Sequence, residues 1–417
     1  MKYIQLFSIL LVFLSSCSNQ EKDIFDASPA ERLNKAMADN LIALTSATNG
    51  WEMAYFTNPT NAGYTLLVKF KPSGMAVIAS QSNLTLNAAY EQDSCLFEMI
   101  GDNGPVLTFN TFSKVLHRFS NPENPDGYGY EGDYEFIVLK TTEQQIILQG
   151  KKYKSIIVMT KLSDTTNWTS YLQSFDNVDK LLFSVNAPKL SMAVKNTVYS
   201  FAEGYKHVFV MKKEGTLTTS FVPFIVTNQG IRFQDKVEIE GVSFQDFKLN
   251  TDNSALVSIE NPDYKLAGVE DLATFAINNL KVWNIDPNKM SSNLKTAYTA
   301  VLDGFKSTYN AEDLKITISY FINRFILTVS YNKSNVKTEG KIDMEIAQTV
   351  KDAITISKKV NSDANGVQFL TDIAQLNSFI SLLSVNYTLS TSSKLNPQEI
   401  KFAKRTDANQ WFVVSVN

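Results

Sequence analysis

Apolar and polar residues alternate along much of the chain with a period of two, the spacing of a β-strand that is buried on one face. Turns of a few residues separate successive runs between residues 51 and 161, which predicts antiparallel pairing. Eight such runs behind a single helix predict a curled sheet or an incomplete barrel. They cover residues 51–56, 63–70, 74–81, 94–100, 105–111, 133–140, 144–150 and 154–161.

The same alternation returns in two later parts of the chain. Residues 340–383 fit a helix and a strand equally well, so their assignment stays open. The runs of the middle part cover 189–194, 205–212, 216–226, 230–234, 237–249 and 255–260, and those of the last part cover 314–321, 324–331, 386–392 and 411–416.

Three segments carry apolar residues at helical spacing instead. The first follows Ser28, with Pro29 next and Glu31 three positions on, which predicts a helix start with a capping box and an end at Asn49-Gly50. The other two helices are expected at 165–183 and about 292–309. Each helix precedes a block of strands, so we predict a strand-dominated α+β fold of antiparallel meander modules, curled sheets or partial barrels, each led by a helix. The expected modules are 28–163, 164–285 and 286–417.

The first seventeen residues have the layout of a bacterial secretion signal. Lys2 precedes an apolar run at 4–14 that is too short for a permanent transmembrane helix. The end of the run, Leu14-Ser15-Ser16-Cys17, resembles the bacterial lipobox, so we expect cleavage before Cys17 and attachment of fatty acids to its sulfur. An ordinary signal peptide with an incidental cysteine is the alternative. Residues 18–27 are polar and predict a tether.

Acidic residues soon after the cysteine indicate where the protein goes. The stretch Gln20-Glu21-Lys22-Asp23 resembles the acidic export signal that sends lipoproteins of Bacteroidota to the outer face of the outer membrane. We therefore expect a protein held at the outer membrane by its lipid anchor and exposed on the cell surface.

The composition narrows the classes of partner. A net charge of −3, 19% charged residues and 44% hydrophobic residues indicate a globular chain. With a pI of about 5.7 and no basic cluster, a nucleic-acid partner is not expected. Once Cys17 is acylated, Cys95 is the remaining thiol, which excludes an internal disulfide, and we expect Cys95 to be buried.

The loop at 121–135 holds the candidate ligand-binding residues. Its tyrosines could stack on sugar rings while its carboxylates accept hydrogen bonds from hydroxyl groups. Carboxylates and backbone carbonyls could also hold Ca²⁺, although the spacing does not follow the EF-hand order, so we expect no metal. A long polar hairpin connection is the simpler interpretation. The candidates are Tyr128, Tyr130, Tyr134, Asp126 and Asp133.

Catalytic patterns are weak. Asp133 and Glu135 alternate on an expected strand and would point the same way, as in a glycosidase pair, but such spacing is commonplace. His117 and His207 are the two histidines; His207 is expected on a strand, buried or half-buried, and their spacing does not fit a zinc site. A nucleophilic thiol would need Cys95 exposed beside one of them. We therefore expect no catalysis and no cofactor.

Several stretches together resemble one protein family. They are the lipobox, the tether, the capped helix, Gly50-Trp51 with Tyr55-Phe56, the stretch 132–136 and the stretch 149–152. In this order they are similar to a lipoprotein family of gut Bacteroidota catalogued as domain of unknown function 4302, over roughly residues 17–260. The family has no established catalytic residues, so no site is carried over.

The resemblance implies a setting for the protein. Members of the family tend to be encoded beside pairs of an outer-membrane transporter and a tethered receptor for nutrient capture. The expected function is thus an accessory binding lipoprotein beside such a transporter complex, with a glycan or peptide as ligand. A glycan- or peptide-directed hydrolase and an adhesive or structural surface protein are the alternatives.

Overall fold

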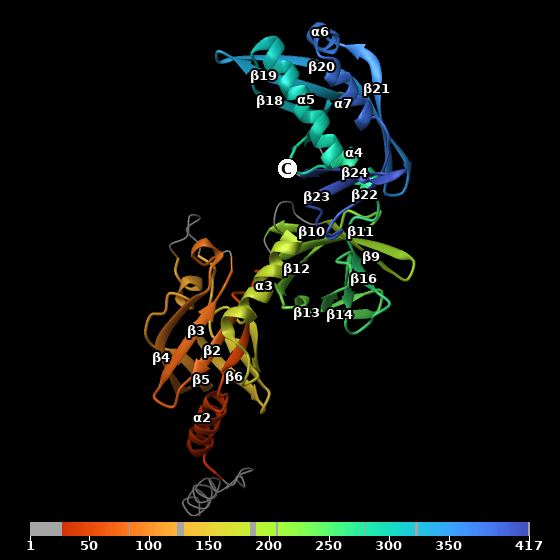
Figure 1. Cartoon of the computed structure of the whole chain (residues 1–417). Coiled ribbons are helices and arrows are strands. Elements are labelled where there is room, and N and C mark those ends of the chain that lie inside the picture. Colours follow the sequence, from red (N-terminus) through yellow and green to blue (C-terminus); the bar gives the residue numbers. More distant parts are fainter. Residues whose placement is uncertain are drawn as a thin grey trace, which may run out of the picture. The chain divides into compact units, whose positions relative to one another are not determined.

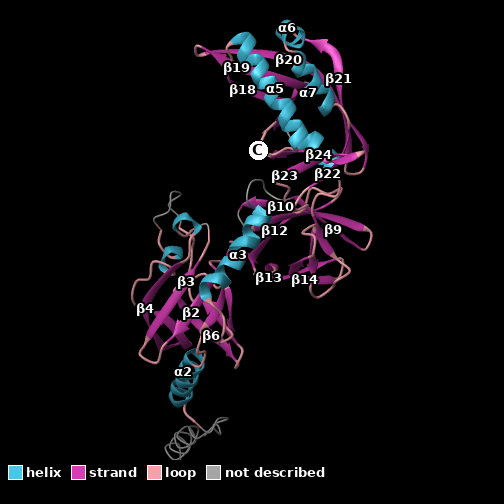
Figure 2. Cartoon of the chain, viewed as in Figure 1, coloured by secondary structure: helices cyan, strands magenta, loops and turns pink. Residues whose placement is uncertain are grey.

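The computed structural model describes residues 27–82, 84–122, 129–183, 189–205, 207–279, 281–321 and 324–415. Its strands form three curled antiparallel sheets, two closed barrels and one half-barrel (Figures 1 and 2). Strands hold 48% of the residues and helices 22%, which confirms the strand-dominated α+β class. The predictions for Cys17, Asp126 and Tyr128 concern residues outside the described ranges.

The first sheet is a closed barrel whose eight strands follow each other in chain order. Alternate residues of the first strand, Trp51, Met53 and Tyr55, are fully buried, as the period of two predicts. Two short 3₁₀ turns, η1 (Leu86–Ala88) and η2 (His117–Phe119), lie in its connections. The strands are β1 (Trp51–Phe56), β2 (Gly63–Phe70), β3 (Met75–Ser80), β4 (Glu91–Asp102), β5 (Gly104–Phe109), β6 (Glu135–Thr141), β7 (Gln145–Gly150) and β8 (Ile156–Lys161).

Helix α2 (Pro29–Thr45) leads into this barrel and begins as predicted. The Ser28 amide donates to Glu31 Oε2 at 2.9 Å and the Glu31 amide donates to Ser28 Oγ at 3.3 Å, the two bonds of a capping box. The helix ends at Thr45, earlier than Asn49-Gly50, because the next amide turns back to the Ala43 carbonyl. Trp51 Nε1 donates to the Leu44 carbonyl at 2.9 Å and so ties the end of the helix to β1.

The second sheet is also a closed barrel, in which β16 pairs with β9. Helix α3 (Trp168–Phe183) adds Val178 and Leu182 to a core of stacked phenylalanines. The strands are β9 (Lys189–Val194), β10 (Thr197–Tyr205), β11 (Val208–Lys213), β12 (Thr219–Val226), β13 (Gly230–Ile239), β14 (Val242–Leu249), β15 (Ala255–Ser258) and β16 (Lys265–Ala267).

Two expected strands of this barrel are broken by turns. The run 237–249 reverses at Glu240 and Gly241, whose φ values of +50° and +75° suit a tight hairpin between β13 and β14. The run 205–212 is interrupted at His207, which has φ +59° and stands between β10 and β11. The prediction that His207 lies on a strand is therefore wrong, whereas its burial is confirmed.

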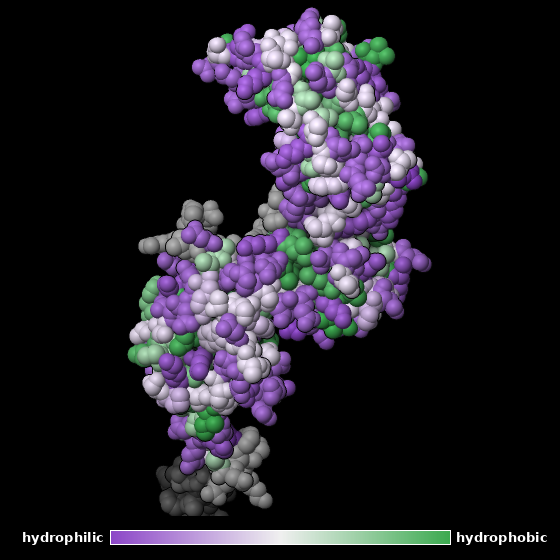
Figure 3. Space-filling model, viewed as in Figure 1, coloured by the Kyte–Doolittle hydropathy of each residue, from purple (hydrophilic) through white to green (hydrophobic). Residues whose placement is uncertain are grey.

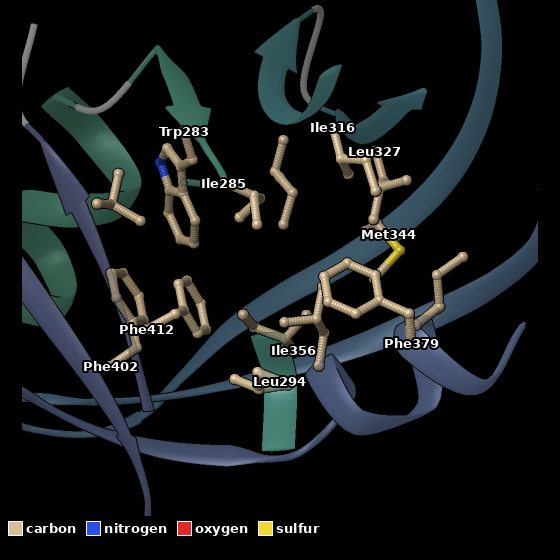
Figure 4. Close-up of a cluster of buried hydrophobic side chains, with 14 of the residues drawn as sticks. Trp283, Ile285, Leu294, Ile316, Leu327, Met344, Ile356, Phe379, Phe402 and Phe412 are labelled. Carbon is tan, nitrogen blue, oxygen red and sulfur yellow. The ribbon is translucent and has the colours of Figure 1, made fainter. Parts of the chain in front are cut away.

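The third sheet is an eight-stranded half-barrel that curves around helices. Figure 1 shows α5 and α7 on its concave side, and Figure 4 shows Trp283, Leu294, Phe379, Phe402 and Phe412 pointing into one apolar cluster. The strands are β17 (Val282–Asn284), β18 (Glu312–Phe321), β19 (Arg324–Lys333), β20 (Val336–Val350), β21 (Ala353–Ser362), β22 (Asn386–Ser390), β23 (Glu399–Lys404) and β24 (Asp407–Ser415). The helices are α4 (Leu272–Asn279), α5 (Ser292–Tyr309), α6 (Ala364–Asp372) and α7 (Ala374–Leu383).

The ambiguous stretch 340–383 contains both kinds of structure, because it holds the end of β20, all of β21 and helices α6 and α7.

By the density of its contacts the chain packs into two compact units. Of the described residues, the first unit holds those within 27–53, 67–78 and 92–166, and the second holds those within 54–66, 79–91 and 167–415.

Cys95 lies on β4 with 4% of its surface exposed, so the expectation of a buried thiol is confirmed. Burial, with a smaller effect of the Asp93 carboxylate, raises the pKa of the thiol to about 11. The thiol is therefore protonated at neutral pH and packs as a small apolar side chain.

Candidate ligand-binding site

Most of the visible surface is polar, and apolar side chains stand there in small groups (Figure 3). A ligand site is therefore best sought where aromatic rings and hydrogen-bonding groups line a hollow. Such a place lies on the first barrel, where β6 begins and β7 ends and Phe136 pairs with Gly150.

The side chain of Asp133 is buried here and holds the backbone in place, so it does not project into solvent. Its carboxylate is buried and accepts the amides of Lys152 on Oδ1 and Tyr153 on Oδ2, each at 2.9 Å. Strand β6 begins only at Glu135, so the prediction that Asp133 and Glu135 alternate along one strand is wrong. Gly150 makes room for the carboxylate, because a Cβ added there would lie 2.2 Å from Asp133 Oδ2. Asp133 thus ties the segment before β6 to the turn after β7.

Glu135 belongs to a small ionic group beside this anchor. Lys151 Nζ lies 3.1 Å from Asp102 Oδ2 and 3.2 Å from Glu135 Oε2. The hydrogen bond to Asp102, followed by that to Glu135, raises the pKa of Lys151, and Lys151 in turn lowers the pKa of Asp102. Because the group is partly exposed to solvent, its contribution to stability is small. It places one donor, the ammonium group of Lys151, beside two carboxylate acceptors.

Tyr134 is an exposed tyrosine of the loop, and its ring lies beside two others. Its ring stacks on His117 with centroids 5.2 Å apart, and the ring of Phe112 also packs against His117, with centroids 5.5 Å apart. The Ser113 amide donates to His117 Nδ1 at 3.1 Å and fixes the imidazole. Tyr134 is 44% exposed and Phe112 is 69% exposed. We call Phe112, His117 and Tyr134 the aromatic row.

Tyr130 differs from Tyr134. It is partly buried, and its ring meets that of Phe119 edge to face at 6.0 Å. Of the candidates that the structure describes, Tyr134 is thus exposed, Asp133 anchors the backbone, and Tyr130 packs against Phe119.

A hollow of about 470 Å³ joins these elements. Tyr134 and Glu135 contribute to its wall, and Lys152 Nζ lies 4.5 Å from the centroid of the Tyr153 ring. Sequence reasoning missed Lys151, Lys152 and Tyr153 as site residues, although they follow β7 directly in a lysine-rich turn. The hollow is lined by Ser120, Gly132, Asp133, Tyr134, Glu135, Lys151, Lys152 and Tyr153.

Comparison with known proteins settles the family. The model of a domain of unknown function, DUF4302, matches residues 21–251. The chain belongs to this family. No curated protein matches it.

Solved structures add nothing to the DUF4302 assignment. Three DNA polymerase III beta chains, from Streptococcus pneumoniae, Eubacterium rectale and Pseudomonas aeruginosa, match at 11%, 10% and 9% identity. Each match covers 91% of this chain and 97% of the other, with TM-scores of 0.15, 0.15 and 0.14. Scores this low carry no argument about fold or function.

The second histidine of this DUF4302 chain lies in a different place. His207 Nε2 is 2.5 Å from Asp179 Oδ1, and its ring packs against Tyr64, Phe183 and Phe224. A cavity of about 30 Å³ beside it has room for about two waters, so it is too small for an organic ligand. The pair is best explained as buried packing with a satisfied Nε2.

The described part of this DUF4302 chain holds no group of three or more His, Cys, Asp or Glu side chains placed to bind a metal ion. Within the same residues, every helix is too short or too polar to span a bilayer. The suggested Ca²⁺ ligands include Asp126, which is outside the described ranges.

The aromatic row predicts a pH dependence. Burial lowers the pKa of His117, so the folded protein favours the neutral ring. The contribution of His117 to the free energy of unfolding is therefore complete above the ordinary histidine pKa of about 6.5. It is lost as the pH falls from that value through the lower pKa that His117 has in the folded state. An NMR titration of the imidazole should give a midpoint below about 6.5. A midpoint at or above that value would contradict the burial of a neutral ring.

Proposed function

We propose that this DUF4302 protein is a lipid-anchored binding protein on the cell surface of a member of the Bacteroidota. In this proposal it works beside an outer-membrane importer of nutrients and holds a glycan or a peptide in the hollow of the first barrel. The observation that carries the proposal is Tyr134, an exposed ring with one face supported by His117 and with hydrogen-bonding groups of the hollow beside it. The anchoring part rests on the N-terminal sequence.

The contacts of the carboxylates favour binding over hydrolysis. A glycosidase needs one carboxyl group to give a proton and a second to attack or to activate water. Here Asp133 is held by two backbone amides and Glu135 is paired with Lys151. Both side chains are engaged in holding the shape of the hollow, which suits recognition without turnover.

Replacing Tyr134 by alanine should weaken ligand binding about tenfold, because an aromatic face contributes about 1 kcal/mol or more to such contacts. Binding is measured by a glycan array and calorimetry on the chain beginning at residue 18. The matched control is Tyr320→Ala, since Tyr320 is 41% exposed on β18 of the third sheet. If both variants bind as tightly as the parent chain, the hollow is not the site.

Lipid attachment is tested separately at Cys17. The mature protein should carry fatty acids on this residue, and a Cys17→Ser variant should leave the membrane fraction, because the anchor is the acyl chains and not the folded domains. Mass spectrometry of the N-terminal peptide and fractionation of cells check this. Protease treatment of intact cells should remove the protein from the surface. An unmodified Cys17 would end the lipoprotein part of the proposal.

A further inference from the structure

The charged groups of the hollow already have contacts of their own. Lys151 lies between Asp102 and Glu135, and the carboxylate of Asp133 accepts two backbone amides. Lys152 Nζ rests over the ring of Tyr153. A strongly anionic or cationic ligand would have to displace one of these contacts, whereas a neutral ligand can use them as they stand.

The backbone around the hollow is also engaged. Strand β6 pairs with β5 on one side and with β7 on the other, within a closed barrel. The Lys151 amide donates to the Glu135 carbonyl at 2.9 Å. A peptide that binds as an added strand needs an open sheet edge, and this place does not provide one.

What remains for a ligand is the exposed Tyr134, which lines the same hollow as Glu135 and Lys151. The Tyr134 ring is stacked on His117, and the residue still exposes 44% of its surface. Burial keeps His117 neutral, so the support adds no charge behind the ring. The Glu135 carboxylate can accept hydrogen bonds from hydroxyl groups of a ligand. Lys151, which already contacts Asp102 and Glu135, has a further N–H that can donate to a ligand oxygen.

We infer that the hollow takes uncharged pyranose units of a glycan chain, with the apolar face of one sugar on Tyr134 and neighbouring hydroxyl groups on Glu135 and Lys151. This inference rests on the proposed function and names its ligand class. We therefore expect acidic glycans, and peptides that bind as an added strand, to bind less tightly than neutral glycans. Phe112, at the other end of the aromatic row, offers a second exposed ring for another unit of the same chain.

The test uses the full chain purified in detergent. A glycan array carries neutral, uronic-acid and sulfated oligosaccharides together with a peptide library. The strongest ligand is then titrated by calorimetry at about 50 mM and about 500 mM NaCl, a range over which screening separates ionic from neutral recognition. The variants are Tyr134→Ala and Glu135→Gln. The control is Glu345→Gln, because Glu345 is an exposed glutamate paired with Lys359 in the third sheet.

Neutral oligosaccharides should bind most tightly, with a Kd that changes less than about twofold between the two salt concentrations. Glu135→Gln should weaken binding about tenfold, and Glu345→Gln should leave it unchanged. If acidic oligosaccharides or peptides bind best and Tyr134→Ala still removes binding, the inference fails and the proposed function stands. If nothing on the array or in the library binds, both fail.

Discussion

The Trp283→Ala variant is expected to lose about 3–5 kcal/mol of unfolding free energy in the half-barrel, the cost typical of deleting a buried aromatic side chain. Trp283 is 1% exposed on β17, and its ring lies 5.0 Å from that of Phe402 and 6.2 Å from that of Phe325. The strand is three residues long and stands at one end of the sheet, so few ladder bonds hold it once the ring is gone.

Hydrogen exchange measured by mass spectrometry checks this prediction, since it reports on the half-barrel separately from the barrels. Trp411→Ala is the matched control, because Trp411 is only partly buried on β24 of the same sheet, with Lys401 Nζ 4.7 Å from its ring centroid. The control should lose much less protection. Equal loss in the two variants would show that the ring of Trp283 is not central to the core.

Gly150→Ala is expected to destabilise the first barrel by about 2–4 kcal/mol and to weaken ligand binding by tenfold or more. An added Cβ would lie 2.2 Å from Asp133 Oδ2, so the carboxylate must leave the amides of Lys152 and Tyr153. Those amides, which are only partly buried, would then lose their acceptor, and the turn that shapes the hollow would move.

A double-mutant cycle isolates this clash. In an Asp133→Ala background most of the obstacle to a Cβ at position 150 is absent, so Gly150→Ala should cost far less there than it does alone. Urea unfolding followed by circular dichroism, with calorimetric ligand titration, gives both readouts. Additive effects of the two substitutions would mean that Gly150 is needed for another reason than the carboxylate.

Local signals predicted much of the fold. The alternation of apolar residues located most strands, and the capping box at Ser28 and Glu31 marked the start of α2. Failures occurred where the decisive contact was distant or the turn was short. The turn at Glu240 and Gly241 occupies two residues inside a continuous apolar pattern, so periodicity alone does not reveal it.

In the candidate site, too, the local features were predictable from the sequence and the distant contacts were not. Tyr134 was predicted as a ligand residue from its own loop, but the stacking of its ring on His117 depends on how a segment seventeen residues earlier folds back. Asp133 fits an alternating strand in sequence, yet its partners are amides 19 and 20 residues away. Neither arrangement can be seen in the local pattern, because one depends on how the connection between β5 and β6 folds back and the other on the pairing of β6 with β7.

The strand order has a consequence for how the molecule is made. Apart from the two barrel closures, each strand is hydrogen-bonded to the strand that precedes or follows it in the chain. Most such neighbours are joined by turns of a few residues, so bringing them together costs little chain entropy. The pairs β5–β6, β17–β18 and β21–β22 are joined by longer connections. A polypeptide that emerges N-terminus first can therefore pair most of its strands in the order in which they appear, before its C-terminus has emerged.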